Sequence, residues 1–339
     1  MPRKDKSLNL DALSEEQLLE LRLCDLPVEI KGSWVEERVG QLYKELESHG
    51  LRLKPACYIG DEWFTPDGVA AIALPFYLFH PRLLQLEKKM MLEAEGGLPE
   101  DCLRLLRHEC GHSYVHAFHL TRRRAWVKLF GSSRAELKDF YHYRPTSRSF
   151  VRHLKGWYAQ SHPEEDFAET FAVWLDPHSD WKKKYAGWPA LKKLEYVDAL
   201  MAELKSPVRA AIRSDMTYQA SSLKRKLARH YQQRRRFYAE EGEDYYDSDL
   251  KTLFPASADG MKAAQWIKTA GPMLDKTVAA WTHEPRITVR RMRVRLKLRC
   301  IGLNLRLPKD ADAAKLGFAA YLSSLISNYV FTSHFKRRP

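Results

Sequence analysis

The chain has 339 residues, a formal net charge of +13, 45% hydrophobic residues and 12% aromatic residues. This composition excludes a wholly disordered chain, and the length allows one large or two medium domains with substantial cores. The five cysteines contain no C-x-x-C pair, which argues against a cysteine zinc ribbon and against a disulfide framework. No apolar run approaches a membrane span, and no apolar core follows the charged start of the chain. We therefore expect a cytoplasmic protein without a membrane partner.

The first fifty residues are predicted to be mainly helical. Residues 1–10 are expected to form a flexible basic tail. Ser14 precedes Gln17 by three residues, which is the spacing of a capping box and predicts a helix start. Apolar residues then recur at helical spacing as far as Leu46, with an interruption near Pro27. Two helices are therefore expected before residue 50.

The period of the apolar residues changes between residues 51 and 79. Residues 52–54, 57–59 and 69–79 favour strands, and turn residues separate them. A small sheet is therefore expected before the next helix. Its last strand contains Ala71, Ile72, Ala73 and Leu74.

The stretch 98–118 has the features of a helix, because Pro99 suits a first turn and two acidic residues follow it near the positive helix end. It places His108, Glu109 and His112 in an H-E-x-x-H pattern. Residues four apart lie one above the other on a helix, so both imidazoles can reach one metal ion. Zinc lowers the pKa of a bound water towards about 7, and the Glu109 carboxylate can act as general base on it. The pattern predicts hydrolysis; two histidines on a solvated helix face are the alternative.

A zinc site of this kind needs a third ligand. The arrangement H-E-x-x-H-x-x-G-x-x-H is excluded, because Val115 and Phe118 stand where it requires glycine and histidine. His116 and His119 lie too far along the helix axis to reach the same ion, so we expect structural or surface roles for them.

A second helix is expected over residues 163–175, because proline suits its first turn and aromatic residues recur along one face. Glu165 and Glu169 share another face. Their spacing suggests that Glu165 binds zinc and that Glu169 accepts the free N–H of a ligating histidine. Two alternatives stay open: glutamates at this spacing are also common on solvated faces, and Glu164 is a rival ligand.

The pattern H-E-C-G-H followed by H-P-E-E-D-F-A-E-T-F-A resembles the bacterial family named putative zinc-binding metallopeptidases, within the gluzincin class. The resemblance covers roughly residues 15–205. The pattern is similar, more distantly, to the catalytic domains of the Mlc titration factor peptidase and of anthrax lethal factor. The resemblance implies a zincin-like fold, in which a small sheet accompanies the H-E-x-x-H helix and a glutamate helix.

The resemblance also implies roles for individual residues. It assigns Zn²⁺ to His108, His112 and Glu165, and the role of general base to Glu109. Tyr158, seven residues before Glu165, corresponds to a tyrosine that supports the oxyanion. An aromatic residue of the core or of an interface is the alternative for Tyr158.

Two further assignments follow from the same resemblance. Glu169 corresponds to the carboxylate that orients a ligating histidine. In gluzincins the edge strand of the sheet pairs with an extended peptide, which assigns substrate binding to Ala71–Leu74. An ordinary buried strand is the alternative for that segment.

The excess positive charge lies in the C-terminal third. Residues 207–339 contain 26 Lys or Arg and 12 Asp or Glu, a net of +14, whereas residues 1–206 carry −1. Apolar and basic residues alternate over 287–299, which predicts a half-buried strand with a basic outer face, and 303–308 is its expected hairpin partner. Such a face can bind an acidic protein or nucleic-acid phosphates, and a solvated face is the alternative.

The predicted fold is α+β, with a zincin-like metallopeptidase domain over residues 11–206 and a basic α+β region of unknown role over residues 207–339. The predicted function is a zinc metallopeptidase that acts on peptides or proteins. The alternative is a regulatory or binding protein that acts through residues 207–339 with little or no peptidase turnover.

Overall fold

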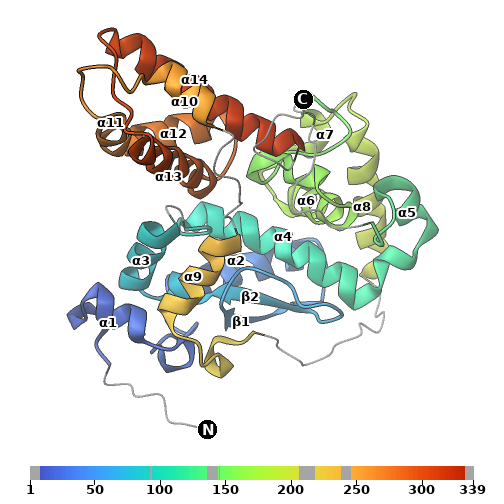
Figure 1. The fold of residues 1–339 in the computed structure, drawn as a ribbon. Coiled ribbons are helices and arrows are strands. Elements are labelled where there is room, and N and C mark those ends of the chain that lie inside the picture. Colours follow the sequence, from blue (N-terminus) through green and yellow to red (C-terminus); the bar gives the residue numbers. More distant parts are fainter. Residues whose placement is uncertain are drawn as a thin grey trace. The chain divides into compact units, whose positions relative to one another are not determined.

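The protein is described by a computed structural model, which covers residues 8–91, 94–135, 144, 146–205, 218–237 and 246–332. The chain divides into two compact units, of which the first comprises Met1–Met90 and Ala94–Tyr231 and the second Met91–Glu93 and Gln232–Pro339 (Figure 1). None of the helices in the described ranges is long and apolar enough to cross a membrane.

Unit 1 contains a two-stranded sheet and most of the helices. Its elements are α1 (Glu15–Glu20), α2 (Trp34–Ser48), β1 (Ala56–Gly60), β2 (Ala71–Pro75), α3 (Pro81–Met91), α4 (Pro99–Phe118), α5 (Arg124–Phe130), the 3₁₀ helix η5 (Lys155–Gln160), α6 (Pro163–Leu175), α7 (Trp181–Lys184) and α8 (Ala190–Leu204). The helix α9 (Leu227–Phe237) begins in unit 1. The coarse prediction of an α+β fold is confirmed, since helices dominate and a small sheet accompanies them.

The predicted helices of the first fifty residues are confirmed. The Ser14 side chain accepts a hydrogen bond from the Gln17 main-chain N–H at 3.3 Å, and the Gln17 side chain accepts one from the Ser14 N–H at 2.8 Å. This capping box starts α1, and Ser33 caps α2 by accepting a hydrogen bond from Glu36 N.

The sheet is smaller than the sequence predicts. β1 and β2 are parallel, in a register that pairs Ala56 with Ala71 and Gly60 with Pro75. Residues 52–54 do not form a strand, because their polar main-chain groups have other partners: the Leu53 oxygen accepts a hydrogen bond from the Tyr114 hydroxyl at 2.9 Å. All five residues of β2 are buried, and Phe64 covers its outer edge by accepting a hydrogen bond from Ala73 N at 2.9 Å.

The helices α4 and α6 form the centre of unit 1 and pack very closely. Gly111 permits this approach, because a Cβ at that position would lie 2.8 Å from the Cα of Ala168. Arg107 ties the same helix to its neighbours: its guanidinium makes two hydrogen bonds of 2.7 Å to Glu45 on α2 and an ion pair of 2.9 Å to Asp176 at the end of α6. The pair α4 and α6 is therefore held by direct backbone contact and by a buried charge network.

Unit 2 is built from helices, and the strand predicted over 287–299 is wrong. Its described elements are α10 (Asp247–Leu253), α11 (Ala263–Thr269), α12 (Gly271–Thr282), α13 (Arg286–Gly302) and α14 (Ala311–Thr332). The alternating stretch lies in α13, where residues 289, 292, 296 and 300 are buried at helical spacing. Strict alternation on a helix puts the remaining apolar residues, such as Leu298, on the exposed side.

The α+β assignment of the C-terminal region is therefore wrong as well. The predicted hairpin partner over 303–308 pairs with other residues at one isolated bridge, between Lys262 and Arg306. A strand needs a neighbouring strand of several residues to satisfy its main-chain hydrogen bonds. No described segment of unit 2 offers such a strand to residues 287–299.

Residues 218–231 pack within unit 1. Lys226 forms a bridge with Arg22, Gln219 forms one with Gly60, and the Arg225 guanidinium is paired with Asp61. Along the chain, the boundary between the two compact units therefore lies near residue 231. The predicted domain boundary near residue 206 stays a prediction, because compactness alone does not show which segments fold or act independently.

Candidate metal centre

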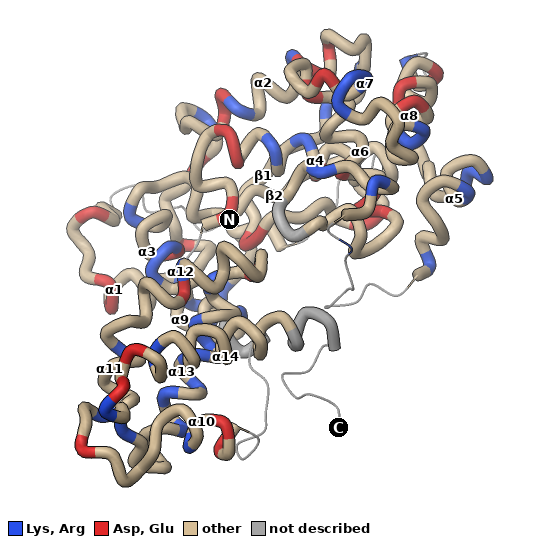
Figure 2. The backbone as a smooth tube through the Cα atoms, turned by 90° about the horizontal axis from the view of Figure 1, so that it is seen from above, with Lys and Arg blue, Asp and Glu red and all other residues tan. Residues whose placement is uncertain are grey.

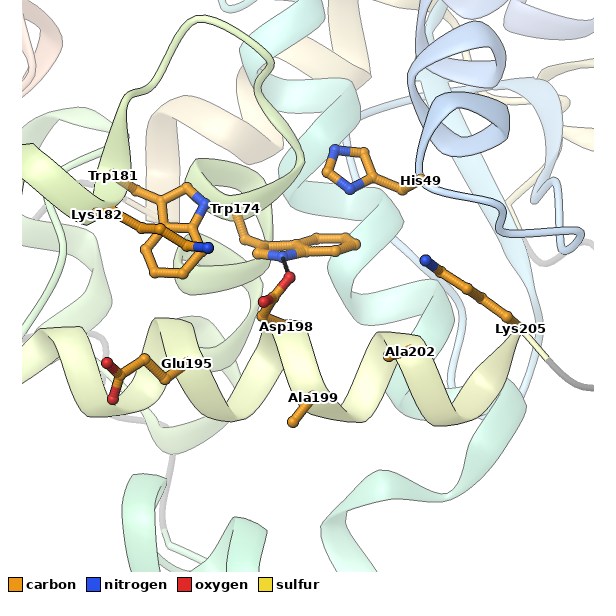
Figure 3. A pocket seen from close by; sticks show the side chains of 9 residues that line it. All are labelled: His49, Trp174, Trp181, Lys182, Glu195, Asp198, Ala199, Ala202 and Lys205. Atoms are coloured by element: carbon orange, nitrogen blue, oxygen red, sulfur yellow. Dashed lines mark hydrogen bonds between the residues drawn. The ribbon is translucent and has the colours of Figure 1, made fainter.

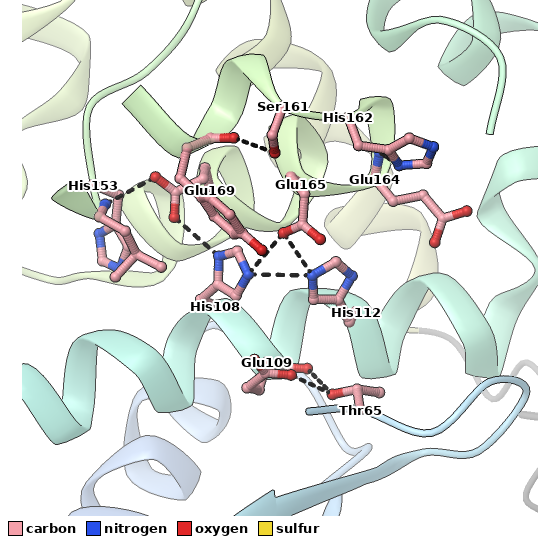
Figure 4. A network of polar contacts seen from close by, with 12 residues as sticks. Thr65, His108, Glu109, His112, His153, Ser161, His162, Glu164, Glu165 and Glu169 are labelled. Carbon is pink, nitrogen blue, oxygen red and sulfur yellow. Dashed lines mark hydrogen bonds and ion pairs between the residues drawn. The ribbon is translucent and has the colours of Figure 1, made fainter. Parts of the chain in front are cut away.

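The helix α4 carries the H-E-x-x-H residues as predicted. It begins with Pro99 in its first turn, followed by Glu100 and Asp101, which suit the positive helix end. The two histidines lie one turn apart, so both rings leave the same side of the helix toward α6 (Figure 4).

The helix α6 brings the two glutamates to that side. His162 caps it, because the His162 ring accepts a hydrogen bond from Glu164 N at 3.2 Å, and Pro163 occupies the first turn. Asp166 connects this first turn to α8, because its buried carboxylate accepts a 2.5 Å hydrogen bond from Lys193. Burial raises the pKa of Asp166 to about 7, although Lys193 acts in the opposite direction.

His108, His112 and Glu165 place three possible ligand atoms at one point. The His108 Nε2 atom lies 3.2 Å from His112 Nε2 and 3.0 Å from Glu165 Oε2, and His112 Nε2 lies 3.1 Å from the same carboxylate oxygen (Figure 4). Among the described residues this is a group of metal-ligand type, and the rival ligand Glu164 is not part of it.

The electrostatics of these residues favour positive charge where they meet. Burial lowers the pKa of His108, but hydrogen bonds to Glu165 and Glu169 outweigh burial and raise that pKa well above its ordinary value. Burial also lowers the pKa of His112, and the charge of Glu165 reverses this to a raised pKa. For Glu165, burial raises the pKa, whereas the charge of His112 and the hydrogen bonds of both histidines lower it well below the ordinary value.

Glu169 orients one of the histidines. Its Oε1 atom lies 2.9 Å from His108 Nδ1, and its Oε2 atom accepts a hydrogen bond from Leu154 N at 2.8 Å. In the neutral ring, a carboxylate on Nδ1 holds the proton there, so that the lone pair of Nε2 is directed toward the ligand group. This is the arrangement expected from the spacing of Glu165 and Glu169.

Glu109 leaves α4 on a different side from the histidines, toward Thr65 (Figure 4). The Thr65 hydroxyl oxygen lies 2.9 Å from Glu109 Oε2 and 3.0 Å from the Glu109 main-chain oxygen. Thr65 is not among the site residues predicted from the sequence. It precedes Glu109 by 44 residues and lies in a segment without periodicity or motif. No sequence signal in this chain distinguishes it from other threonines.

The two remaining predicted site features differ in their surroundings. Tyr158 lies in η5, half-buried, with its ring centre 5.6 Å from that of His108. The segment Ala71–Leu74 is buried in β2, where Ala71 O accepts a hydrogen bond from Ser113 at 3.3 Å and Ala73 N is bonded to Phe64. Its role in substrate binding stays a prediction.

His116 and His119 lie outside the ligand group, as expected. His116 Nε2 is 3.9 Å from Asp67, and His119 ends α4 in the left-handed conformation with φ of 50°.

A separate cleft of about 440 Å³ lies on α8, away from these residues (Figure 3). The Trp174 indole N–H donates to Asp198 at 2.9 Å, and the Lys182 ammonium lies 5.1 Å from the centre of the Trp181 ring. Lysines and carboxylates both line this cleft, so its chemistry does not select one class of ligand.

The comparisons with known proteins bear on the helix pair α4 and α6. Residues 101–186 match the family model described as "Putative zinc-binding metallo-peptidase". This segment is similar to a zinc-binding metallopeptidase. No curated protein and no solved structure matches the chain. The matched segment contains both histidines, Glu109 and both glutamates of the centre.

The donor set fits Zn²⁺. Zinc binds imidazole nitrogen and carboxylate oxygen at about 2.0–2.1 Å, and a tetrahedral arrangement then places neighbouring ligand atoms about 3.3 Å apart. The observed separations of 3.0–3.2 Å agree with this spacing. Three protein ligands also leave a fourth position for water or substrate, as in catalytic rather than structural zinc sites.

Proposed function

We propose that the protein is a gluzincin-type zinc metallopeptidase that hydrolyses peptide bonds. The observation that carries this proposal is the convergence of His108, His112 and Glu165 within 3.0–3.2 Å, with a carboxylate adjacent on the same helix. The family match over residues 101–186 supports the same assignment.

Each residue has a defined task in this proposal. Zinc, when bound, polarises the scissile carbonyl and acidifies the attacking water. Glu109 takes a proton from that water and later delivers it to the leaving amine. Tyr158 donates its hydroxyl hydrogen to the carbonyl oxygen as negative charge develops there. Glu169 holds His108 in the tautomer that leaves Nε2 free as a ligand.

We also propose that an extended peptide binds along the edge of the sheet. In this proposal Ala71–Leu74 lie behind the edge and do not pair with the peptide themselves. They are buried in β2, and the Ala73 N–H already donates a hydrogen bond to Phe64 O. The segment 62–65 lies outside β2, with Glu62 exposed and the other three residues partly exposed, and it ends at Thr65 beside Glu109. Its main chain is therefore better placed than that of β2 to pair with a substrate.

The test is metal content together with cleavage of a peptide library, for wild type and Glu109→Gln. This variant keeps the ligands and loses the base, so we expect one zinc per chain in both proteins and cleavage in the wild type alone. Glu100→Gln, an exposed residue of the same helix, is the matched control and should cleave like wild type.

Three other results would contradict parts of the proposal. Wild-type protein without zinc would contradict the ligand assignment. Zinc with equal cleavage by wild type and Glu109→Gln would contradict the role of Glu109, and zinc without cleavage in either would favour a regulatory protein.

A second candidate function is binding of a partner through the basic C-terminal region, with little peptidase turnover. Lys and Arg occur along α13, whereas α14 is almost uncharged (Figure 2). Within α13, Arg293 is paired with Asp275 and Arg299 with Asp247. Leu298 and Ile301 of the same helix are each 58% exposed. An acidic protein with apolar side chains therefore suits this helix better than bare nucleic-acid phosphates do.

This candidate is tested by passing the full chain over immobilised duplex DNA at low salt. Retention that falls steeply with salt would favour nucleic acid. Absence of retention would exclude nucleic acid and leave an acidic protein as the partner to seek.

A further inference from the structure

We propose that Thr65 is a positioning residue, which anchors one oxygen of the Glu109 carboxylate and leaves the other to exchange protons with the reactants. The proposal rests on the function proposed above, since it gives Glu109 the role of general base. It adds a residue that lies outside the H-E-x-x-H helix and outside residues 101–186, the segment that matches the family model.

The contact is short and shielded. The Thr65 hydroxyl oxygen is 2.9 Å from Oε2 of Glu109, and Glu109 is only 7% exposed. No hydrogen bond of the described residues reaches the other carboxylate oxygen, Oε1. The hydroxyl has a single hydrogen, and an ionised carboxylate is a stronger acceptor than the main-chain oxygen at 3.0 Å. Thr65 therefore donates to Oε2.

The segment around Thr65 is fixed on both sides. The preceding residue, Phe64, accepts the hydrogen bond from Ala73 N at 2.9 Å. Trp63 donates its indole N–H to Glu95 O at 3.2 Å, and Asp61 is paired with Arg225. Pro66, which follows, is buried and has a restricted main chain. The hydroxyl is thus presented by a rigid segment rather than by a freely rotating loop.

This anchoring matters because a glutamate side chain has three rotatable bonds. A base must hold one oxygen within hydrogen-bond reach of the proton that it takes, and a misplacement of about 1 Å can cost a factor of 100 in rate. One charge-assisted hydrogen bond to Oε2 removes most of the freedom of the carboxylate. Oε1 is then the oxygen that takes the proton of the attacking water and passes it to the leaving amine.

The test compares Thr65→Val, which keeps the shape and removes the hydroxyl, with Thr65→Ser, which keeps the hydroxyl. Thr121→Val is the control for a threonine-to-valine substitution as such, because Thr121 lies in unit 1 but outside the ligand group. Two readouts are used for each protein: kcat and KM for a cleaved peptide, and the affinity of the cobalt-substituted protein for acetohydroxamate, followed by its visible spectrum. A hydroxamate gives up or shares a proton with the base, so its affinity reports the position of Glu109 without turnover.

We expect Thr65→Val to lower kcat about tenfold with KM and zinc content unchanged, and to weaken acetohydroxamate binding by a similar factor. Thr65→Ser should restore both values to within about threefold of wild type, and Thr121→Val should match wild type.

Three results would overturn the proposal. Thr65→Val equal to wild type in both readouts would show that the contact has no consequence. Thr65→Val with higher kcat or tighter hydroxamate binding would show that Thr65 restrains Glu109 in an unproductive position. Thr65→Ser as defective as Thr65→Val, or loss of zinc from either, would show a structural role of the segment.

The outcome for the proposed function is separable. If wild type binds cobalt and hydroxamate but cleaves no peptide, the peptidase assignment fails while the hydroxamate affinities still decide the role of Thr65. If wild type binds no metal, both proposals fail together.

Discussion

The helix pairs α12–α13 and α4–α6 both bury charged side chains, and they do so in opposite ways. In unit 2, Arg293 of α13 donates to both oxygens of Asp275 on α12, at 2.6 and 2.8 Å, and to the Ile267 oxygen at 3.3 Å. Gly271 leaves room for this guanidinium, since a Cβ there would lie 2.7 Å from it. The hydrogen-bond donors of Arg293 match the acceptors of Asp275, so this buried pair is satisfied without a bound ion or ligand.

In unit 1, the contact between α4 and α6 brings hydrogen-bond acceptors together without matching donors. Three lone-pair acceptors from His108, His112 and Glu165 lie within 3.0–3.2 Å of one another. Acceptors at such distances repel unless a proton or a metal cation lies between them, which is why the pKa of His108 is raised and that of Glu165 is lowered. The difference between the two pairs teaches that a buried polar cluster indicates a binding site when its own groups cannot satisfy one another.

The largest effect is expected from Glu165→Gln, which removes the charged ligand. Structural zinc binding amounts to about 10–16 kcal/mol over four ligands, so loss of one should weaken affinity by two to three orders of magnitude, and cleavage should disappear. Competition with a chromophoric chelator measures this. The neighbouring Glu164→Gln is the matched control and should bind zinc like wild type. The reverse order of the two variants would show that the rival ligand is the true one.

Arg293→Ala should destabilise unit 2 by about 3–5 kcal/mol, because it leaves Asp275 buried without its partner. Urea unfolding of the full chain measures the loss. Replacing both residues together, as Arg293→Met with Asp275→Leu, should recover most of it, since an apolar pair needs no counter-charge. Zinc content should stay unchanged in both variants. A fall in zinc content would mean that the two helix pairs are not independent, and the contrast between them would fail.

Glu169→Gln should lower zinc affinity by about 10- to 100-fold, because the neutral amide holds the Nδ1 proton of His108 less firmly. The change is smaller than for Glu165→Gln because all three ligands remain. Chelator competition again gives the value. An affinity equal to wild type would show that Leu154 N, rather than His108, is the important partner of this carboxylate.

The smallest effect concerns Glu284, a half-buried carboxyl of unit 2. Burial raises its pKa to about 7. The unfolded chain gives up this proton at lower pH, so ionisation of Glu284 costs stability as pH rises from about 4.5 through 7. Glu284→Gln should therefore be more stable than wild type by about 1–2 kcal/mol at pH 8, and much less so at pH 5. Urea unfolding at the two pH values measures this, and a difference independent of pH would contradict it.

Some errors in the sequence predictions have a common physical origin. Residues 291–299 alternate strictly, yet α13 also carries apolar residues at 289, 292, 296 and 300, which fit a helix equally well. The surroundings of the segment determine whether it folds as a helix or as a strand. The helices α11, α12 and α14 offer apolar side chains, and no strand among the described residues of unit 2 offers hydrogen bonds. Periodicity over a short stretch leaves this choice open.

The local features of the candidate metal centre could be predicted from the sequence. The i, i+4 spacing of His108 and His112, the proline in each first turn and the spacing of Glu165 from Glu169 are properties of single helices, so they could be predicted from consecutive residues. The strand at 57–59 could be predicted in the same way, and so could part of the strand predicted over 69–79, which the structure limits to 71–75 and continues as a 3₁₀ helix over 76–79.

The way in which these helices combine depends on tertiary packing. The separation of 3.0–3.2 Å between ligand atoms depends on the close approach of α4 to α6 at Gly111, and the choice of Glu165 over Glu164 depends on the rotation of α6 about its axis. The contact between Thr65 and Glu109 joins residues 44 apart in the chain. Such contacts arise from packing of the whole core, which no local pattern encodes.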